Sequence, residues 1–133
     1  MNYVLTIYAD ESGWDEVTPE QMQAQLQRWT DLTTEMRDAG AFVAGEGLQP
    51  SATATVVKIP AEGEDALVTD GPFAETKEQL LGFYLLECDG LDAALAWAKK
   101  VPSRPGSSVE VRPVMYYDEY GGETTAATAQ AAS

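Results

Sequence analysis

Two segments of this chain have helical periodicity, and segments that alternate like β-strands lie before, between and after them. The first helical segment is predicted to begin at Pro19, because Thr18 and Gln21 have the spacing of a capping box and proline suits a first turn. Gly40 is its expected stop. Its larger side chains share one face: Met22, Leu26, Trp29, Thr33 and Met36.

The second helical segment follows Asp89, which is expected to cap it, and ends before Pro102. Lys99 and Lys100 lie near its end, where positive charge is favourable to the helix dipole. The apolar face of this helix consists of Leu91, Ala94, Leu95, Ala98 and Val101.

Strands are predicted for residues 2–9, 41–47, 52–59, 66–69, 82–88 and 108–116. Two helices cannot cover both faces of a sheet built from these strands, so both are expected on one face. The predicted fold class is therefore α+β, a ferredoxin-like two-layer sandwich. Tyr8, Tyr84 and Tyr116 are expected to share the open face. A partly apolar open face favours a homodimer packed sheet to sheet.

The length of 133 residues indicates one domain, which we assign to residues 1–117. Residues 118–133 are predicted to form a disordered tail, because almost all of them are small or polar. No apolar run approaches the roughly 20 residues of a membrane span. The uncharged start, residues 1–5, is unlike a signal peptide, so we expect a cytoplasmic protein without a membrane partner.

Charge and residue content exclude several classes of function. The formal charge is −14, from 22 acidic and 8 basic residues, which is unsuited to binding nucleic acid. The chain has no histidine, so serine–histidine and cysteine–histidine catalysis and histidine-ligated zinc are ruled out. Cys88 is the single cysteine and is expected to be a buried, unreactive thiol. No metal-binding or phosphate-binding motif is complete, so no metal or cofactor is expected.

Residues 69–77 (TDGPFAETK) concentrate chemically useful side chains in a turn. Asp70 is either a general base or a turn residue whose carboxylate accepts backbone N–H bonds. Phe73 is either part of the core or the wall of a ligand pocket. Glu75 and Lys77 are predicted to lie in a short helical turn, where they form either a solvated ion pair or an acid/cation pair beside Asp70. A third reading is that Lys77 holds an anionic ligand.

Three residues outside this turn are further candidates for ligand binding. Glu46 lies between two glycines, which permit a bulge or the close approach of a ligand, and it could pair with Asp70. Arg112 is expected on the open face, where it binds a carboxylate, pairs with Glu110 or forms a bridge across a dimer. Tyr84 is expected to contribute to interface packing or to ligand contacts.

Residues 68–80 (VTDGPFAETKEQL) and 82–85 (GFYL) resemble the signature of the DGPF group of the YCII-related family. Residues 1–10, 45–50 (GEGLQP) and 109–114 (VEVRPV) agree with the same resemblance, which extends over residues 1 to 117. It implies a ferredoxin-like fold assembled as a dimeric α/β barrel, and kinship with muconolactone isomerase and a chlorohydroquinone dehydrochlorinase.

The resemblance also bears on function. Enzymes of this kind are proposed to use a histidine–aspartate pair; Asp70 matches the aspartate, and no residue here matches the histidine. Genes of the DGPF group often neighbour those of extracytoplasmic-function sigma factors. We therefore expect a dimeric small-ligand-binding or accessory protein, with a small ligand or a sigma factor as partner. The alternative is a small acid–base enzyme of the lactone isomerase or dehydrochlorinase type that uses Asp70 without a histidine.

Overall fold

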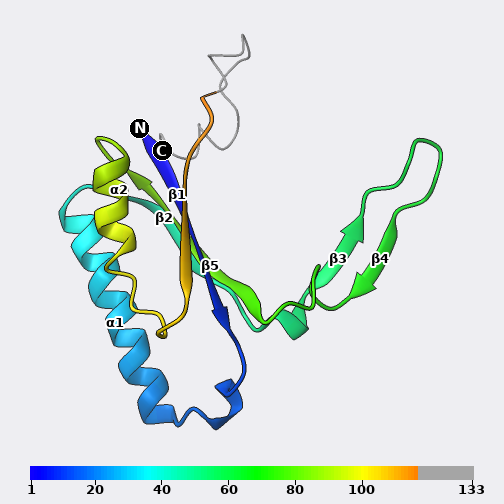
Figure 1. Cartoon of the computed structure of the whole chain (residues 1–133), viewed down its shortest axis with the longest axis horizontal. Helices are drawn as coiled ribbons and strands as arrows, with labels where there is room; N and C mark the ends of the chain where they lie inside the picture. The colour runs from blue at the N-terminus through cyan, green and yellow to red at the C-terminus, as the bar shows by residue number, and fades with distance from the viewer. Residues whose placement is uncertain (117–133) are drawn as a thin grey trace.

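A computed structural model describes residues 1–116. Four antiparallel strands form the main sheet in the order β2-β5-β1-β6. Both helices pack on one face of this sheet, which confirms the α+β two-layer sandwich (Figure 1). The main strands are β1 (Asn2–Asp10), β2 (Phe42–Gly47), β5 (Glu78–Glu87) and β6 (Ser108–Pro113), and the helices are α1 (Pro19–Asp38) and α2 (Leu91–Ala98). The predicted tail at 118–133 lies outside the described residues.

Strand β1 is central to the sheet and alternates between its two faces. Tyr3, Leu5, Ile7 and Ala9 are buried on the side of the helices. The residues between them are half-buried and face the open side, as the period of two in a strand requires. The predicted alternation of this strand is confirmed.

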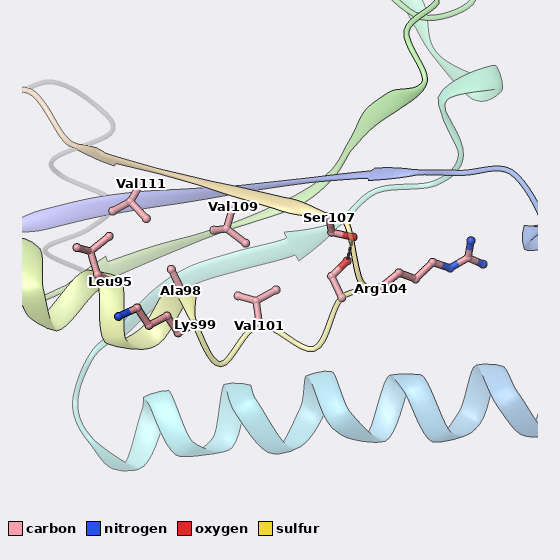
Figure 2. A pocket seen from close by; sticks show the side chains of 9 residues that line it. Leu95, Ala98, Lys99, Val101, Arg104, Ser107, Val109 and Val111 are labelled. Atoms are coloured by element: carbon pink, nitrogen blue, oxygen red, sulfur yellow. Dashed lines mark hydrogen bonds between the residues drawn. The ribbon is translucent and has the colours of Figure 1, made fainter.

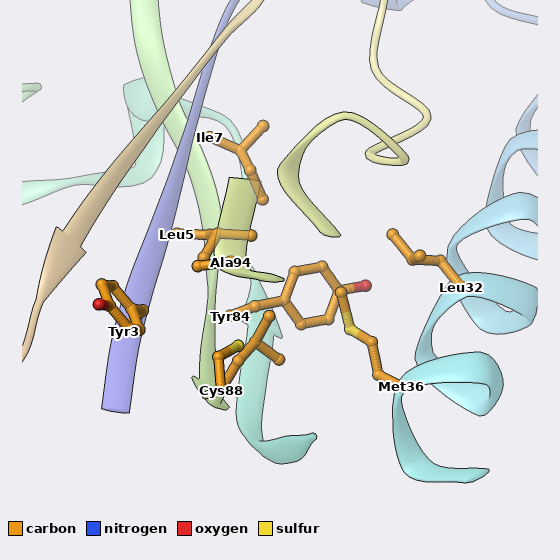
Figure 3. Close-up of a cluster of buried hydrophobic side chains, with 9 residues drawn as sticks. Tyr3, Leu5, Ile7, Leu32, Met36, Tyr84, Cys88 and Ala94 are labelled. Carbon is orange, nitrogen blue, oxygen red and sulfur yellow. The ribbon is translucent and has the colours of Figure 1, made fainter. Parts of the chain in front are cut away.

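The core lies between the sheet and the helices (Figure 3). Leu5, Leu86 and Met36 are its fully buried large side chains, from β1, β5 and α1. Tyr84 points into the same layer, toward Met36, and is 6% exposed. Its expected place on the open face beside Tyr8 was therefore wrong. Phe83 and Leu85 take that face instead.

Helix α1 begins and ends as its sequence predicts. The Thr18 hydroxyl accepts a hydrogen bond from Gln21 N at 3.1 Å, and the Gln21 side chain accepts one from Thr18 N at 3.0 Å. These two bonds satisfy backbone donors that a first helical turn otherwise leaves free. Gly40 follows the helix with φ of +74°, a conformation that favours glycine.

Helix α2 begins differently from the prediction. Its N-cap is Gly90, with no side-chain cap hydrogen bond, so Asp89 does not cap the helix. The buried Ala94 holds this short helix against the core. Tertiary packing therefore fixes the helix where a capping side chain does not.

Strands β3 (Thr55–Lys58) and β4 (Leu67–Asp70) do not join the main sheet. They pair only with each other as an antiparallel hairpin. We call residues 54–77 the arm, because this hairpin and the loop after it extend away from the sandwich on the side opposite to the helices (Figure 1). The following strand, β5, begins at Glu78, earlier than the predicted residue 82.

Burial raises the pKa of the Cys88 thiol, and the negative charge of Glu87 adds to this effect. Because the thiolate is the reactive form, we expect Cys88 in the folded protein to react slowly with Ellman's reagent near neutral pH. In urea the same thiol should react at the rate of a free cysteine. Equal rates in both conditions would contradict the buried position.

Candidate functional site

A groove of about 1020 Å³ runs between α1 and the helix-facing side of the sheet. Its lining extends along α1 from Gln21 to Arg37, which corresponds to about 24 Å of helix. The opposite wall comes from β2 and β5. Trp14, from a short 3₁₀ helix (Trp14–Glu16), and the loop residue Arg104 also line the groove. Ligand sites of small molecules commonly measure about 300–1,000 Å³, so this groove is of sufficient size.

Small residues on the sheet make room for the groove. Ala9, Gly45 and Gly82 line it from β1, β2 and β5. A larger side chain at any of these positions would project into the space between the sheet and α1. The groove therefore exists because three neighbouring strands place little or no side chain beneath this part of the helix.

Close contacts require glycine at both position 45 and position 82. A Cβ atom at Gly45 would lie 2.7 Å from Cδ1 of Tyr84, and one at Gly82 would lie 2.5 Å from the Glu46 carbonyl oxygen. Strand β2 also has a register shift between Phe42 and Ala44. The close approach at Gly45 and Gly82 is thus one between parts of the protein itself, and the close approach of a ligand beside Glu46 stays a prediction.

Aromatic rings form one wall of the groove. Trp29 and Tyr84 stack with ring centroids 6.2 Å apart and an interplanar angle of 28°. Phe42 meets Tyr84 edge to face at 6.3 Å. The Tyr84 hydroxyl lies 2.9 Å from Thr33 Oγ1, which fixes the ring against α1. These mutual contacts hold the rings of the wall in place.

Charged groups lie at both ends of the groove. Arg37 places its guanidinium 4.4 Å from the centre of the Phe42 ring, a cation–π contact. Arg104 donates a hydrogen bond from Nη1 to the Ser12 carbonyl oxygen at 2.9 Å. Glu46 is the acidic residue in the lining. The groove thus gathers two of the few cationic side chains of a strongly acidic chain.

The outer rim of the groove is apolar and open to solvent. Met22 and Leu26, on the first half of α1, are 43% and 57% exposed. The predicted apolar face of this helix is therefore only partly a core face. Its second half packs through Leu32 and Met36, and its first half borders the groove.

A second cavity, of about 360 Å³, lies between α2 and β6 (Figure 2). Val109 and Val111 project into it from β6, and Leu95 and Ala98 face them from α2. Ser107 lies at one end. Its hydroxyl is 2.9 Å from that of Ser103, which also lines the cavity. Its lining is mainly aliphatic and lacks the aromatic wall of the groove, so we treat the groove as the candidate site.

The structure divides the predicted site residues among three places. Glu46 and Tyr84 line the groove. Asp70, Phe73, Glu75 and Lys77 belong to the arm, outside the groove lining. Arg112 lies on β6, where its Nη1 is 3.7 Å from Glu110 Oε1, so the alternative of a pair with Glu110 is the observed one.

Asp70 is the last residue of β4 and is exposed. It pairs with Thr55, and Gly71 follows with φ of +103°, a conformation that favours glycine. Within residues 1–116 no hydrogen bond or ion pair engages the Asp70 carboxylate. Phe73 is 92% exposed, so it is not part of the core in a single chain.

Glu75 and Lys77 do not form an ion pair within the described part of the chain, and residues 71–77 contain bends but no helical turn. Lys77 lies near another acid, Asp10. The pKa of Asp10 is lowered chiefly by hydrogen bonds from Ser12, one of them from Ser12 N at 2.8 Å, and further by the charges of Lys77 and Arg104. Lys77 thus supplies positive charge close to Asp10, at the start of the loop after β1.

Apart from Tyr84, the aromatic and arginine residues of the groove were not predicted as site residues. Trp29 was assigned to the core face of a helix, and Arg37, Phe42 and Arg104 had no distinguishing motif. The glycines at 45, 47 and 82 were the sequence feature that could have indicated the groove. Glycines within strands mark places where a backbone or a ligand approaches closely.

Neither a metal site nor a membrane span is evident in the described part. No cluster of three or more acidic or cysteine side chains that could hold a metal ion occurs in residues 1–116. Within the same residues, no helix is both long and apolar enough to cross a membrane.

Comparison with known proteins gives two findings. The model of the YCII-related domain matches residues 1–118. A curated protein of Rhizobium meliloti (strain 1021), "Uncharacterized protein R00369", is 38% identical over 119 residues, which cover 88% of this chain and 94% of that protein. These matches extend over the sandwich and the arm alike. The chain therefore belongs to the YCII-related family.

Proposed function

We propose that this YCII-related protein is a cytoplasmic ligand-binding protein, and that its ligand is a small aromatic acid held in the groove. The observation that carries the proposal is the combination of a stacked aromatic wall and two arginines around a space of about 1020 Å³. Apolar pockets with a few convergent polar groups are the usual form of small-molecule sites.

The aromatic part of the ligand is supported by Trp29 and Tyr84. Their rings are held by mutual stacking and by the contact between the Tyr84 hydroxyl and Thr33. A planar ligand beside these rings gains offset or edge-to-face contact, worth about 0.5–1.5 kcal/mol beyond area burial for each aromatic pair.

The acidic part of the ligand is supported by Arg37 and Arg104. The chain has 8 basic residues against 22 acidic ones, so an anion is repelled by most of the surface. A guanidinium can hold a carboxylate through two parallel hydrogen bonds. Glu46 in the same lining disfavours a second negative group near it, so a ligand with a single carboxylate fits best.

An accessory role beside an extracytoplasmic-function sigma factor is the regulatory part of this proposal. This role rests on the resemblance of residues 70–73 to the DGPF group. In such a role, the binding of the ligand would be the signal that the protein senses. The acid–base enzyme that uses Asp70 has less support, because Asp70 is exposed on the arm and absent from the groove lining.

The proposal is tested by thermal unfolding with naphthoate and with its neutral analogue naphthamide. At ten times its Kd a ligand stabilises the folded state by about 1.4 kcal/mol, which corresponds to a rise in Tm of roughly 3–6 °C. We expect this rise with naphthoate and a smaller one with naphthamide. Arg37→Gln should raise the Kd for naphthoate roughly tenfold, because it removes a charged hydrogen-bond donor.

Arg28→Gln is the matched control. Arg28 is an exposed residue of the same helix and does not line the groove, so this variant should bind naphthoate like the wild type. Equal weakening in both arginine variants would indicate a general charge effect and not a site. Absence of any shift across a set of aromatic acids would count against the proposed function.

A further inference from the structure

We propose that the cavity between α2 and β6 is a second binding site, and that its ligand is an aliphatic carboxylate of about six to eight carbons. This proposal goes beyond ligand binding in the groove and does not depend on it. Its basis is the aliphatic lining of the cavity, the position of the cavity at the edge of the sheet, and a lysine in the lining whose charge no described residue neutralises.

The walls of the cavity are aliphatic on both sides. Val109 and Val111 project from β6 toward Leu95 and Ala98 of α2 (Figure 2), and Val101 continues the second wall after the helix. No aromatic residue of the described chain belongs to this lining. An alkyl chain gains from such walls by removal of its methylene groups from water and requires no stacking partner. The lining therefore favours an aliphatic ligand over an aromatic one.

The cavity is small and lies where a ligand can reach it. Its volume of about 360 Å³ is near the lower end of the range of about 300–1,000 Å³ for small-molecule sites, which suits a short alkyl chain. Strand β6 is an edge strand of the main sheet. A ligand can thus enter between α2 and β6 without separating any pair of strands.

Lys99 supplies the charge that a carboxylate requires. It lines the cavity at the C-terminal end of α2, and within residues 1–116 no ion pair engages its ammonium group. The neighbouring Lys100, by contrast, is paired with Glu35. Figure 2 shows the Lys99 ammonium directed toward Leu95, one turn back along the helix. In a chain of formal charge −14, an unneutralised cation beside an aliphatic wall favours an anion with an apolar tail.

The other polar groups of the lining are already engaged. Arg104 donates from Nη1 to the Ser12 carbonyl oxygen at 2.9 Å, and its guanidinium points away from the aliphatic residues (Figure 2). The hydroxyls of Ser103 and Ser107 are 2.9 Å apart, within hydrogen-bonding distance of each other. Among the described residues that line the cavity, Lys99 is therefore the one whose charge is available. The carboxylate is expected beside Lys99, with the alkyl chain along β6.

The first test measures the binding of octanoate by isothermal titration calorimetry. We expect saturable binding with a Kd below roughly 5 mM. Hexanoate should bind roughly tenfold more weakly, because it buries two methylene groups fewer. Lys99→Gln should raise the Kd for octanoate about threefold to fivefold, as an exposed ion pair contributes only modestly. Lys58→Gln, which removes an exposed lysine of the arm, is the matched control and should bind like the wild type.

A second pair of variants tests whether the cavity itself holds the alkyl chain. Ala98→Leu places a larger side chain in the cavity and should raise the Kd for octanoate at least roughly tenfold. Ala96→Leu makes the same change at an exposed position of α2 outside the lining, so its affinity should equal that of the wild type. Alanine and leucine are both good helix formers, so neither variant should weaken the helix itself.

A third measurement locates the ligand in the wild-type chain and needs no variant. Octanoate should shift the methyl NMR signals of Val109, Val111 and Leu95, which line the cavity. The proposal is overturned by the lack of saturable binding up to roughly 10 mM octanoate, by equal affinity of the Ala98→Leu and Ala96→Leu variants, or by methyl shifts centred on Leu81 in the groove.

Discussion

A Leu5→Ala substitution is expected to lower the free energy of unfolding by about 2–5 kcal/mol. Leu5 is fully buried in the central strand β1, in the same core cluster as Leu86 and Met36. The truncation removes apolar contacts from both the sheet and the helix layer and leaves a cavity that packed neighbours fill only partly. A loss of this size is a large fraction of the stability of an ordinary domain.

Urea unfolding followed by circular dichroism measures this effect. Leu91→Ala is the matched control, because it makes the same chemical change at a leucine that is 50% exposed on α2. Its cost should stay below about 1 kcal/mol. Similar costs for the two variants would show that Leu5 is not in a close-packed core.

A Gly82→Ala substitution is expected to separate strands β5 and β2 and to destabilise the fold by about 1–3 kcal/mol. The added Cβ would lie 2.5 Å from the Glu46 carbonyl oxygen and 3.1 Å from Gly47 Cα. Both atoms belong to the backbone of the neighbouring strand, so relief requires the strand itself to move. The same movement would displace Glu46 and alter the groove.

Gly47→Ala provides the control within the same strand pair. Gly47 pairs with Gly82, but a Cβ at Gly47 meets no atom within 4 Å. We expect urea unfolding to show a cost of at most about 0.5 kcal/mol for Gly47→Ala. Naphthoate binding should weaken in Gly82→Ala and persist in Gly47→Ala. If alanine is tolerated equally at both positions, the close approach of the two strands is not required.

Local chemistry made the ends of α1 and the alternation of β1 predictable. Thr18, Gln21 and Gly40 act through contacts within a few residues of themselves, so their roles can be recognised without knowledge of the fold. Burial of every second residue in β1 likewise follows from strand geometry alone. The order of helices and strands then limited the fold to a two-layer sandwich.

Long-range pairing could not be predicted in the same way. Strand β5 has apolar residues on both of its faces: Phe83 and Leu85 on one, and Tyr84 and Leu86 on the other. Its sequence therefore does not indicate which face packs against the helices. The hairpin of β3 and β4 has the same strand-like composition as the main strands, and nothing local distinguishes a projecting arm from a sheet member. The groove depends on residues from several separate elements, which only the tertiary structure brings together.

The small residues beneath α1 have a consequence for how ligand size can be selected in this fold. Gly82 is constrained by the neighbouring backbone, and Gly45 by the ring of Tyr84. Ala9 is buried on the central strand β1 and is the third of these residues. A larger side chain at position 9 would therefore reduce the space in the groove, while the pairing of the strands stays the same.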